Sequence, residues 1–154
     1  MICMGTFSFL HAKLSTPSII GSNMVLQRGQ SCPIWGWASP NAYINLIFAG
    51  KTYQTKANQQ GGWRIKLDPL EASFKQQTMI IAEGRSNGFS RVRKNFSTQL
   101  KNQPGSLVYE NILVGEVWLC SGQSNMQWGV SSSDDSDLET LSANYPNIRL
   151  ISVP

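Results

Sequence analysis

The feature that most constrains the fold is a series of short apolar runs, separated by turn-forming residues, between about Met24 and Thr98. The runs are rich in β-branched and aromatic residues and span 32–38, 42–49, 63–67 and 78–82. The breakers between them contain Gly, Pro, Asn and Ser and lie at 39–41, 50–51, 58–62 and 86–88. Strand-sized segments at this spacing predict a mostly β protein that begins with an antiparallel β-sandwich.

One of these runs also indicates which of its faces is buried. In the segment 42–49, Ile44, Leu46 and Phe48 occupy alternate positions. Successive side chains of a strand point to opposite faces, so these three share one face. We expect that apolar face to pack against the other sheet.

The pattern changes at the polar segment Lys-Asn-Gln-Pro-Gly, residues 101–105. Compact domains join at polar segments that contain Pro and Gly, so we predict a domain boundary between Thr98 and Ser106. This divides the chain into a leader or disordered segment at 1–20, a β-sandwich at 21–105 and the start of a second domain at 106–154.

The segment after this boundary resembles an α/β fold. The apolar runs 112–114 and 117–120 are typical of a strand that is buried on both faces. Residues 134–143 begin with acidic side chains and predict a helix, in which Leu138 and Leu141 share a face. A further strand is predicted at 148–153. Strand, helix and strand in this order predict the opening of a parallel α/β domain.

Charge and length argue against two functional classes. The net charge is +4, and residues 1–110 carry twelve Lys and Arg against four Asp and Glu, whereas 111–154 carry one Arg against five acidic residues. The basic residues are scattered and no nucleic-acid reading motif accompanies them, so we expect no nucleic-acid partner. No apolar stretch reaches the roughly 18–20 residues that a transmembrane helix needs, so no membrane span is predicted.

The cysteines do not predict a metal site. Cys3, Cys32 and Cys120 show no CxxC or Cys/His spacing, so we predict no metal and no cofactor, and their disulfide state stays open. Cys120 lies in the run Val-Trp-Leu-Cys, which predicts a small buried apolar side chain. We read the acidic run from Asp134 to Glu139 as a helix start in preference to a cation site.

The candidate catalytic residue is Ser124. The segment 115–127 runs from an expected buried strand into Ser121-Gly122-Gln123-Ser124-Asn125. A serine is a useful nucleophile when a tight turn presents its hydroxyl near a base and near backbone N–H groups that stabilise an oxyanion. Gly122 permits such a turn. On the residues alone, a second interpretation is favoured, in which Ser124 caps a helix, because Gly-x-Ser is common in turns and helix caps.

Three sequence blocks resemble one known family. GEVWLCSGQSNMQW (115–128) resembles the nucleophile block of the sialate O-acetylesterases, within the SGNH-hydrolase superfamily. GSNMVLQRGQSCPIWGWASPNAYINLIF (21–48) and GGWRIKLDPL (61–70) are similar to the family's N-terminal signature and to its tryptophan strand. The resemblance extends from about Asn23 to Pro154.

The resemblance implies a function and a set of roles. It implies that the chain is a serine esterase that removes acetyl groups from an O-acetylated sugar, such as a sialic acid, without a cofactor. Ser124 would be the nucleophile and its backbone N–H an oxyanion donor, while Gly122, Gln123 and Asn125 would support the turn or the substrate. It also implies a truncated SGNH-hydrolase domain, a secreted, periplasmic or lysosomal location, and a missing C-terminal half that carries the catalytic Asp-x-x-His.

Alternatives to this interpretation remain open. One is a non-catalytic carbohydrate-binding β-sandwich, and another is a gene fragment without a function of its own. Trp35, Trp37 and Trp63 suit either a sugar-stacking platform or core packing, and we favour packing because tryptophans on strands are more often buried. His11, the single histidine, precedes the first expected strand, and we do not expect it to be the catalytic base.

Overall fold

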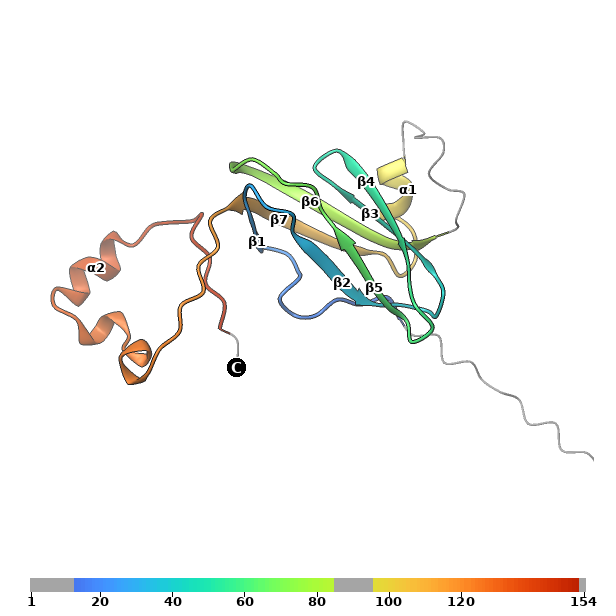
Figure 1. Ribbon diagram of the computed structural model, residues 1–154. Helices are drawn as coiled ribbons and strands as arrows, with labels where there is room; N and C mark the ends of the chain where they lie inside the picture. Colours follow the sequence, from blue (N-terminus) through green and yellow to red (C-terminus); the bar gives the residue numbers. More distant parts are fainter. Residues whose placement is uncertain (1–12, 85–95, 153–154) are drawn as a thin grey trace, which may run out of the picture.

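The computed structural model describes residues 13–84 and 96–152 (Figure 1). His11 and Cys3 lie outside the described residues. The chain is mostly β, with a curled mixed sheet and few helices. The strands are β1 (Val25–Gln27), β2 (Pro33–Trp37), β3 (Tyr43–Phe48), β4 (Lys51–Lys56), β5 (Gly62–Lys66), β6 (Ser73–Gly84) and β7 (Leu107–Gly115). The helices are α1 (Phe96–Lys101), α2 (Ser136–Ser142) and the 3₁₀ turns η1 (Ser124–Gln127) and η2 (Val130–Ser132).

Five of the strands form one sheet and two form a separate ribbon. The sheet has the order β1-β7-β6-β3-β4, in which β1 runs parallel to β7 and the other neighbours are antiparallel. The ribbon pairs β2 with β5 in antiparallel register. β3 and β4 are joined by Ala49 and Gly50, both with positive φ, and such two-residue turns match the twist of a hairpin.

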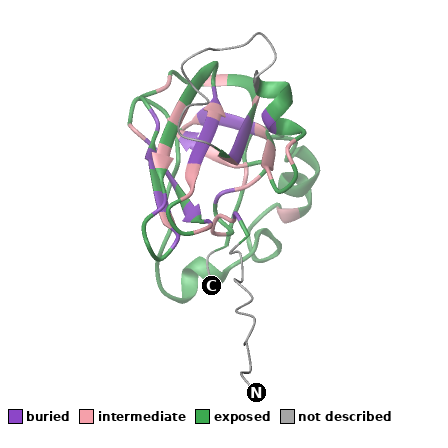
Figure 2. Cartoon of the chain, turned by 90° about the vertical axis from the view of Figure 1, so that its right-hand side faces the viewer, coloured by how far each residue is buried: buried purple, intermediate pink, exposed green. Residues whose placement is uncertain are grey.

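The main core includes side chains from the five-stranded sheet and from the ribbon. Ile44, Leu46 and Phe48 of β3 are at most 1% exposed and cluster with Ile34 and Ile65 of the ribbon. The apolar face predicted for β3 is therefore confirmed. Figure 2 shows the buried residues concentrated on the strands, with mostly exposed segments around them.

A smaller cluster covers the opposite face of the sheet. Leu100 of α1, a helix that the sequence pattern did not predict, packs with Ile80 and Ala82 of β6 and with Ile47 of β3. Asn45 on this face is buried, and its side-chain oxygen accepts a hydrogen bond from Gln54 Nε2 at 2.9 Å. Both faces of β3 are thus in contact with other parts of the chain.

β7 extends the sheet beyond the expected domain boundary. It pairs with both β6 and β1, so the sheet includes residues 107–115 and continues past the boundary predicted between Thr98 and Ser106. Its first half, Leu-Val-Tyr-Glu-Asn, lacks a continuous apolar run, which is why the pattern indicated a strand only from residue 112. The position of the domain boundary stays a prediction, and we now propose it after Gly115.

The strands predicted at 117–120 and 148–153 are wrong as far as the structure describes them. Residues 116–123 and 148–152 contain no strand. Val117, Trp118 and Leu119 are 54%, 83% and 93% exposed, so the run is not buried on both faces. A strand needs a neighbour that accepts and donates its backbone hydrogen bonds, and no described segment pairs with either run.

Two further expectations for this segment have mixed outcomes. The helix predicted at 134–143 is present as α2 and has Asp137 and Glu139 in its first turn, but Leu138 and Leu141 are exposed. The expectation that Cys120 is buried is wrong, because its side chain is exposed beyond the end of β7. These side chains are apolar, but no described segment packs against them.

Candidate active-site segment

The segment that carries the sequence-predicted site leaves the sheet at the end of β7 and is held there by side chains of β1 and the turn that follows it. Glu116 accepts hydrogen bonds from Arg28 Nε at 2.8 Å and from Gln27 Nε2 at 3.0 Å. The Gln27 Oε1 atom in turn accepts the N–H of Val117 at 2.8 Å. These contacts set the direction in which the chain leaves the sheet.

The four predicted site residues lie together at one turn. Gly122 precedes the turn, Gln123 is the residue before η1, and Ser124 and Asn125 are its first two residues. The N–H of Met126 donates to the carbonyl oxygen of Gln123 at 2.9 Å and closes the turn. All four residues are exposed.

Gly122 lies close to the side chain of Met126. A Cβ atom built on Gly122 would lie 2.5 Å from Cγ of Met126, which is closer than real Cβ contacts allow. The turn therefore fits tightly against the next side chain of the segment. The interpretation of Ser124 as a helix cap is not supported by the geometry, because Gln123 occupies the cap position and makes no side-chain capping bond.

The described residues supply no hydrogen-bond partner for the Ser124 hydroxyl. Within residues 13–84 and 96–152, no side chain hydrogen-bonds the Ser124 hydroxyl, and no group of three or more His, Cys, Asp and Glu residues is placed to hold a metal ion. The turn can present a hydroxyl and backbone N–H groups to a ligand. A reaction at neutral pH also needs a group that accepts the serine proton.

The sequence analysis missed the residue that returns the segment to the sheet, Arg149. Its Nη1 donates to the carbonyl oxygens of Met24 and Asn111, and its Nη2 donates to Asn111 Oδ1 at 2.9 Å. Asn111 Nδ2 donates to Asn23 Oδ1 at 2.7 Å, which ties β7 to the residues before β1. Both ends of the segment 117–148 are therefore attached to β1, β7 and the residues beside them.

A β-bulge in β7 contains Asn111, which accepts hydrogen bonds from Arg149. Gln77 pairs with Ile112 and Met79 pairs with Tyr109, so β7 contains one residue more than β6 over this stretch. Asn111 within the bulge has φ of 58°, a conformation that Asn tolerates better than most residues. The sequence held one usable signal for this contact, since Arg149 is the single basic residue after Lys101.

Comparison with known proteins identifies relatives of the chain. It is 30% identical over 149 residues to the sialate O-acetylesterase of Mus musculus and 29% identical over 145 residues to that of Homo sapiens. Each alignment covers 88% of this chain and 24% of the relative. The chain is related to the sialate O-acetylesterases. It spans about a quarter of the length of the relatives it matches, and no family model matches it.

A solved structure supports the same relationship. The crystal structure of a carbohydrate acetylesterase from Xanthomonas citri matches with a TM-score of 0.69 and 31% sequence identity, over 86% of this chain and 26% of that one. An alignment over 88% of 154 residues leaves out about 18, and Ser124 lies 30 residues before the last. The region aligned with the sialate O-acetylesterases therefore extends past Ser124.

Helix length bears on one further expectation. None of the helices within residues 13–84 and 96–152 is both long enough and apolar enough to cross a membrane.

Proposed function

We propose that the chain carries the nucleophile of a carbohydrate O-acetylesterase, and that Ser124 is that nucleophile. In this proposal Ser124 attacks the acetyl carbonyl of an O-acetylated sugar, forms an acyl-serine and releases the sugar hydroxyl. Water then hydrolyses the acyl-serine and releases acetate. The backbone N–H of Ser124 donates to the oxyanion, and Gly122, Gln123 and Asn125 support the turn.

The proposal assigns a role to each region of the chain. Residues 21–115 are the family's N-terminal β-sandwich, and residues 116–152 begin an SGNH-type hydrolase domain. The exposed apolar residues of the second region, such as Trp118 and Leu119, are the surface that further strands of such a domain would cover. The family's implied secreted, periplasmic or lysosomal location is part of the same proposal.

The observation that carries the proposal is the placement of Ser124. Ser124 is exposed at the start of η1, two residues after Gly122. The relatives of the chain are named as acetylesterases. An exposed serine at a sharp turn is accessible to an acyl group, which a core serine or a satisfied cap is not. No observation favours Ser121 over Ser124 at this turn.

The test replaces the matching quarter of the mouse sialate O-acetylesterase with this chain and measures acetyl release from an O-acetylated sialic acid. We expect Ser124→Ala to lower kcat by at least about 10³ because the nucleophile is removed. Ser121→Ala is the matched control and should retain most of the activity. Equal activity of the Ser124→Ala and unsubstituted hybrids, both shown to be folded by their thermal melts, would reject the assignment.

The 154-residue chain alone should hydrolyse 4-nitrophenyl acetate at close to the background rate. The reason is that no described side chain is placed to accept the Ser124 proton, and general-base catalysis contributes about 10²–10⁴ in rate. Serine-dependent turnover by the isolated chain, abolished in Ser124→Ala, would show that the chain supplies a base from residues outside 13–84 and 96–152.

A further inference from the structure

The β2–β5 ribbon has an outer face that the core does not use. Ile34 and Ile65 point inward and are buried, whereas Trp35 and Trp37 are 37% and 51% exposed. Positions i and i+2 of a strand share a face, so the two indoles lie on the outer side about 6–7 Å apart along β2. The packing role that we expected for these two tryptophans is wrong. Of the three, Trp63 is the one that packs in the core.

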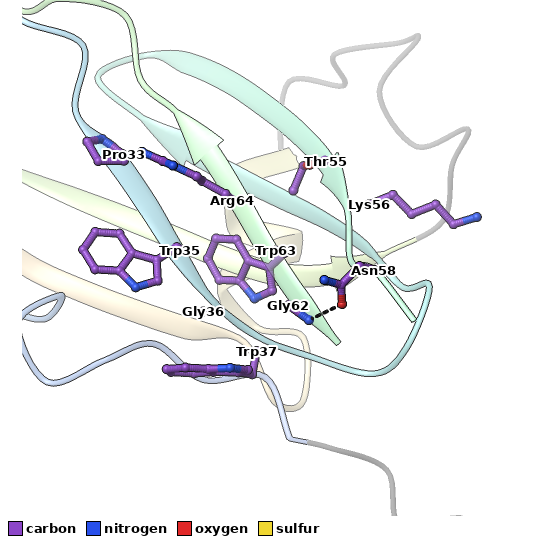
Figure 3. Close-up of a pocket in the computed structure, with 10 residues that line it drawn as sticks. All are labelled: Pro33, Trp35, Gly36, Trp37, Thr55, Lys56, Asn58, Gly62, Trp63 and Arg64. Atoms are coloured by element: carbon purple, nitrogen blue, oxygen red, sulfur yellow. Dashed lines mark hydrogen bonds between the residues drawn. The ribbon is translucent and has the colours of Figure 1, made fainter. Parts of the chain in front are cut away.

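A groove of about 740 Å³ includes this outer face. We call it the tryptophan groove and define it by Trp35, Trp37, Trp63, Lys56, Asn58 and Arg64. Figure 3 shows Trp35 and Trp37 on β2 and Trp63 on β5, with Lys56 and Asn58 toward one end of the groove. None of its lining residues belongs to the segment that carries Ser124.

The end of the groove near Asn58 is held open by local hydrogen bonds. The Asn58 side-chain oxygen accepts the N–H of Gln60 at 2.9 Å and of Gly62 at 2.8 Å, which orders the turn before β5. Gly36 has no room for a side chain, because a Cβ there would lie 2.0 Å from the Ser15 carbonyl oxygen. Backbone of Gly36 and Gly62 therefore contributes to the lining of the groove.

The charge of the groove is positive. Arg64 lies directly opposite Trp35 in the register of the ribbon and extends toward Pro33 (Figure 3). Lys56 Nζ lies 5.6 Å from the centre of the Tyr43 ring. The lining residues include no Asp or Glu, and no carboxylate of the described residues pairs with Arg64. An anionic ligand is complementary to such a surface.

A buried donor at the groove lacks an acceptor. Trp63 is 4% exposed, and its indole Nε1 finds no hydrogen-bond partner among the described residues. Buried polar groups are nearly always hydrogen-bonded, so an unpaired one needs an explanation. Trp63 shares the inward face of β5 with Ile65, so this donor lies in the core and not on the face that carries Trp35, Trp37 and Arg64.

We propose that the tryptophan groove binds a glycan that carries carboxylate groups. The indoles of Trp35 and Trp37 stack on the apolar faces of sugar rings, and Arg64, which shares their face of the ribbon, pairs with a carboxylate. This site is distinct from the turn that carries Ser124, and the proposal does not depend on which residue is the nucleophile.

The test measures binding of sialyllactose to the 154-residue chain by tryptophan fluorescence and by calorimetry. Lactose is the matched neutral ligand, since it lacks only the carboxylated sugar. We expect sialyllactose to bind at least about tenfold more tightly than lactose, and the binding to weaken as salt is raised from 0.1 to 1 M because screening reduces the attraction of Arg64. Equal binding of the two ligands, or no binding of sialyllactose, would overturn the proposal.

Variants locate the site. Trp35→Ala/Trp37→Ala should weaken sialyllactose binding about tenfold or more, as truncation of aromatic anchors does, and Arg64→Gln should remove most of the preference over lactose. The matched control is Phe74→Ala, which removes an aromatic side chain that is 81% exposed on β6. Ser124→Ala should bind as the unsubstituted chain does, so failure of the esterase proposal and failure of this one are distinguishable.

One result would assign the face to something else. If Trp35→Ala/Trp37→Ala leaves glycan binding unchanged but converts an associating chain into a monomer by sedimentation, the face contacts a second copy. Trp63→Phe is a second control, because it retains the core ring and removes only the unpaired N–H, so it should leave the melting temperature unchanged or higher and leave glycan binding unchanged.

Discussion

Residues 13–115 and 116–152 carry similar apolar patterns, yet they bury them very differently. In the first region, Leu46 of β3 is fully buried between the sheet and the ribbon. In the second, Leu119 is 93% exposed, although it lies in an equally apolar run. The comparison shows that an apolar strand pattern favours burial of its side chains. Burial follows only where another strand or sheet lies against them.

The largest expected effect comes from removing β7 at the junction of the two regions. Residues 13–105 lack the strand that pairs with both β1 and β6, so this shortened chain should show no cooperative thermal transition. Residues 13–116 retain the whole sheet and should melt cooperatively. Circular dichroism on both chains measures the difference. Equal cooperative melts would place the domain boundary back between Thr98 and Ser106.

A matched pair of leucine substitutions tests the difference in burial directly. Leu46→Ala should lower the free energy of unfolding by about 2–5 kcal/mol, because it leaves a cavity in the core. Leu119→Ala is the same chemical change at an exposed position and should alter stability by no more than about 0.5 kcal/mol. Chemical denaturation of both variants provides the values. A large loss in Leu119→Ala would mean that the second region is buried in solution.

A smaller, local effect should follow from releasing Arg149. Arg149→Ala removes the hydrogen bonds to Met24 and Asn111, so amide hydrogen exchange in residues 117–148 should quicken about tenfold or more. Exchange in β3 and β6 should not change.

The other tether of the segment provides the control for Arg149→Ala. Arg28→Ala breaks the ion pair with Glu116, whose two side chains are about half exposed, and should have a smaller effect on exchange. If neither variant changes exchange in residues 117–148, the two tethers do not hold the segment.

The smallest expected effect is the pH dependence of one surface pair. The Lys51 ammonium bonded at 2.9 Å holds the pKa of the Asp68 carboxyl below its ordinary value, and the same pair raises the pKa of Lys51. The stabilisation is present above the unfolded pKa of Asp, about 3.9, and is lost as the pH falls through the lower folded value. The melting temperatures of the unsubstituted chain and of Asp68→Asn should therefore converge in acid. A constant difference across that range would exclude the pair as its cause.

The fold of the first region was largely predictable because its signals are local. Alternation in β3 and the breakers at 50–51 and 58–62 each depend on neighbouring residues, and the structure contains strands on both sides of these breakers. β4, with the sequence Lys-Thr-Tyr-Gln-Thr-Lys, was missed because its polar residues carry no apolar period. It becomes a strand because its backbone pairs with β3.

The turn at the candidate site was recognisable in the sequence, whereas the contacts that support it were not. The Gly-Gln-Ser-Asn turn was recognisable in the sequence, and the structure places its residues side by side in an exposed turn. The contacts of Arg149 with Asn111 and Met24 were not predictable, because residues 38 and 125 positions apart in the chain meet only after β7 has bulged and the segment has returned.

The sequence by itself determined the strand-rich first region, the apolar face of β3, the acidic start of α2 and the turn that presents Ser124. Those features depend on periodicity, turn residues and the conformational freedom of glycine, which act over a few residues. Only the tertiary structure decided that β7 belongs to the first sheet, that Trp63 is buried while Trp35 and Trp37 face outward, and that residues 117–120 stay uncovered. Each of these depends on which distant segment lies next to the residue, since backbone pairing and burial are properties of neighbours in space.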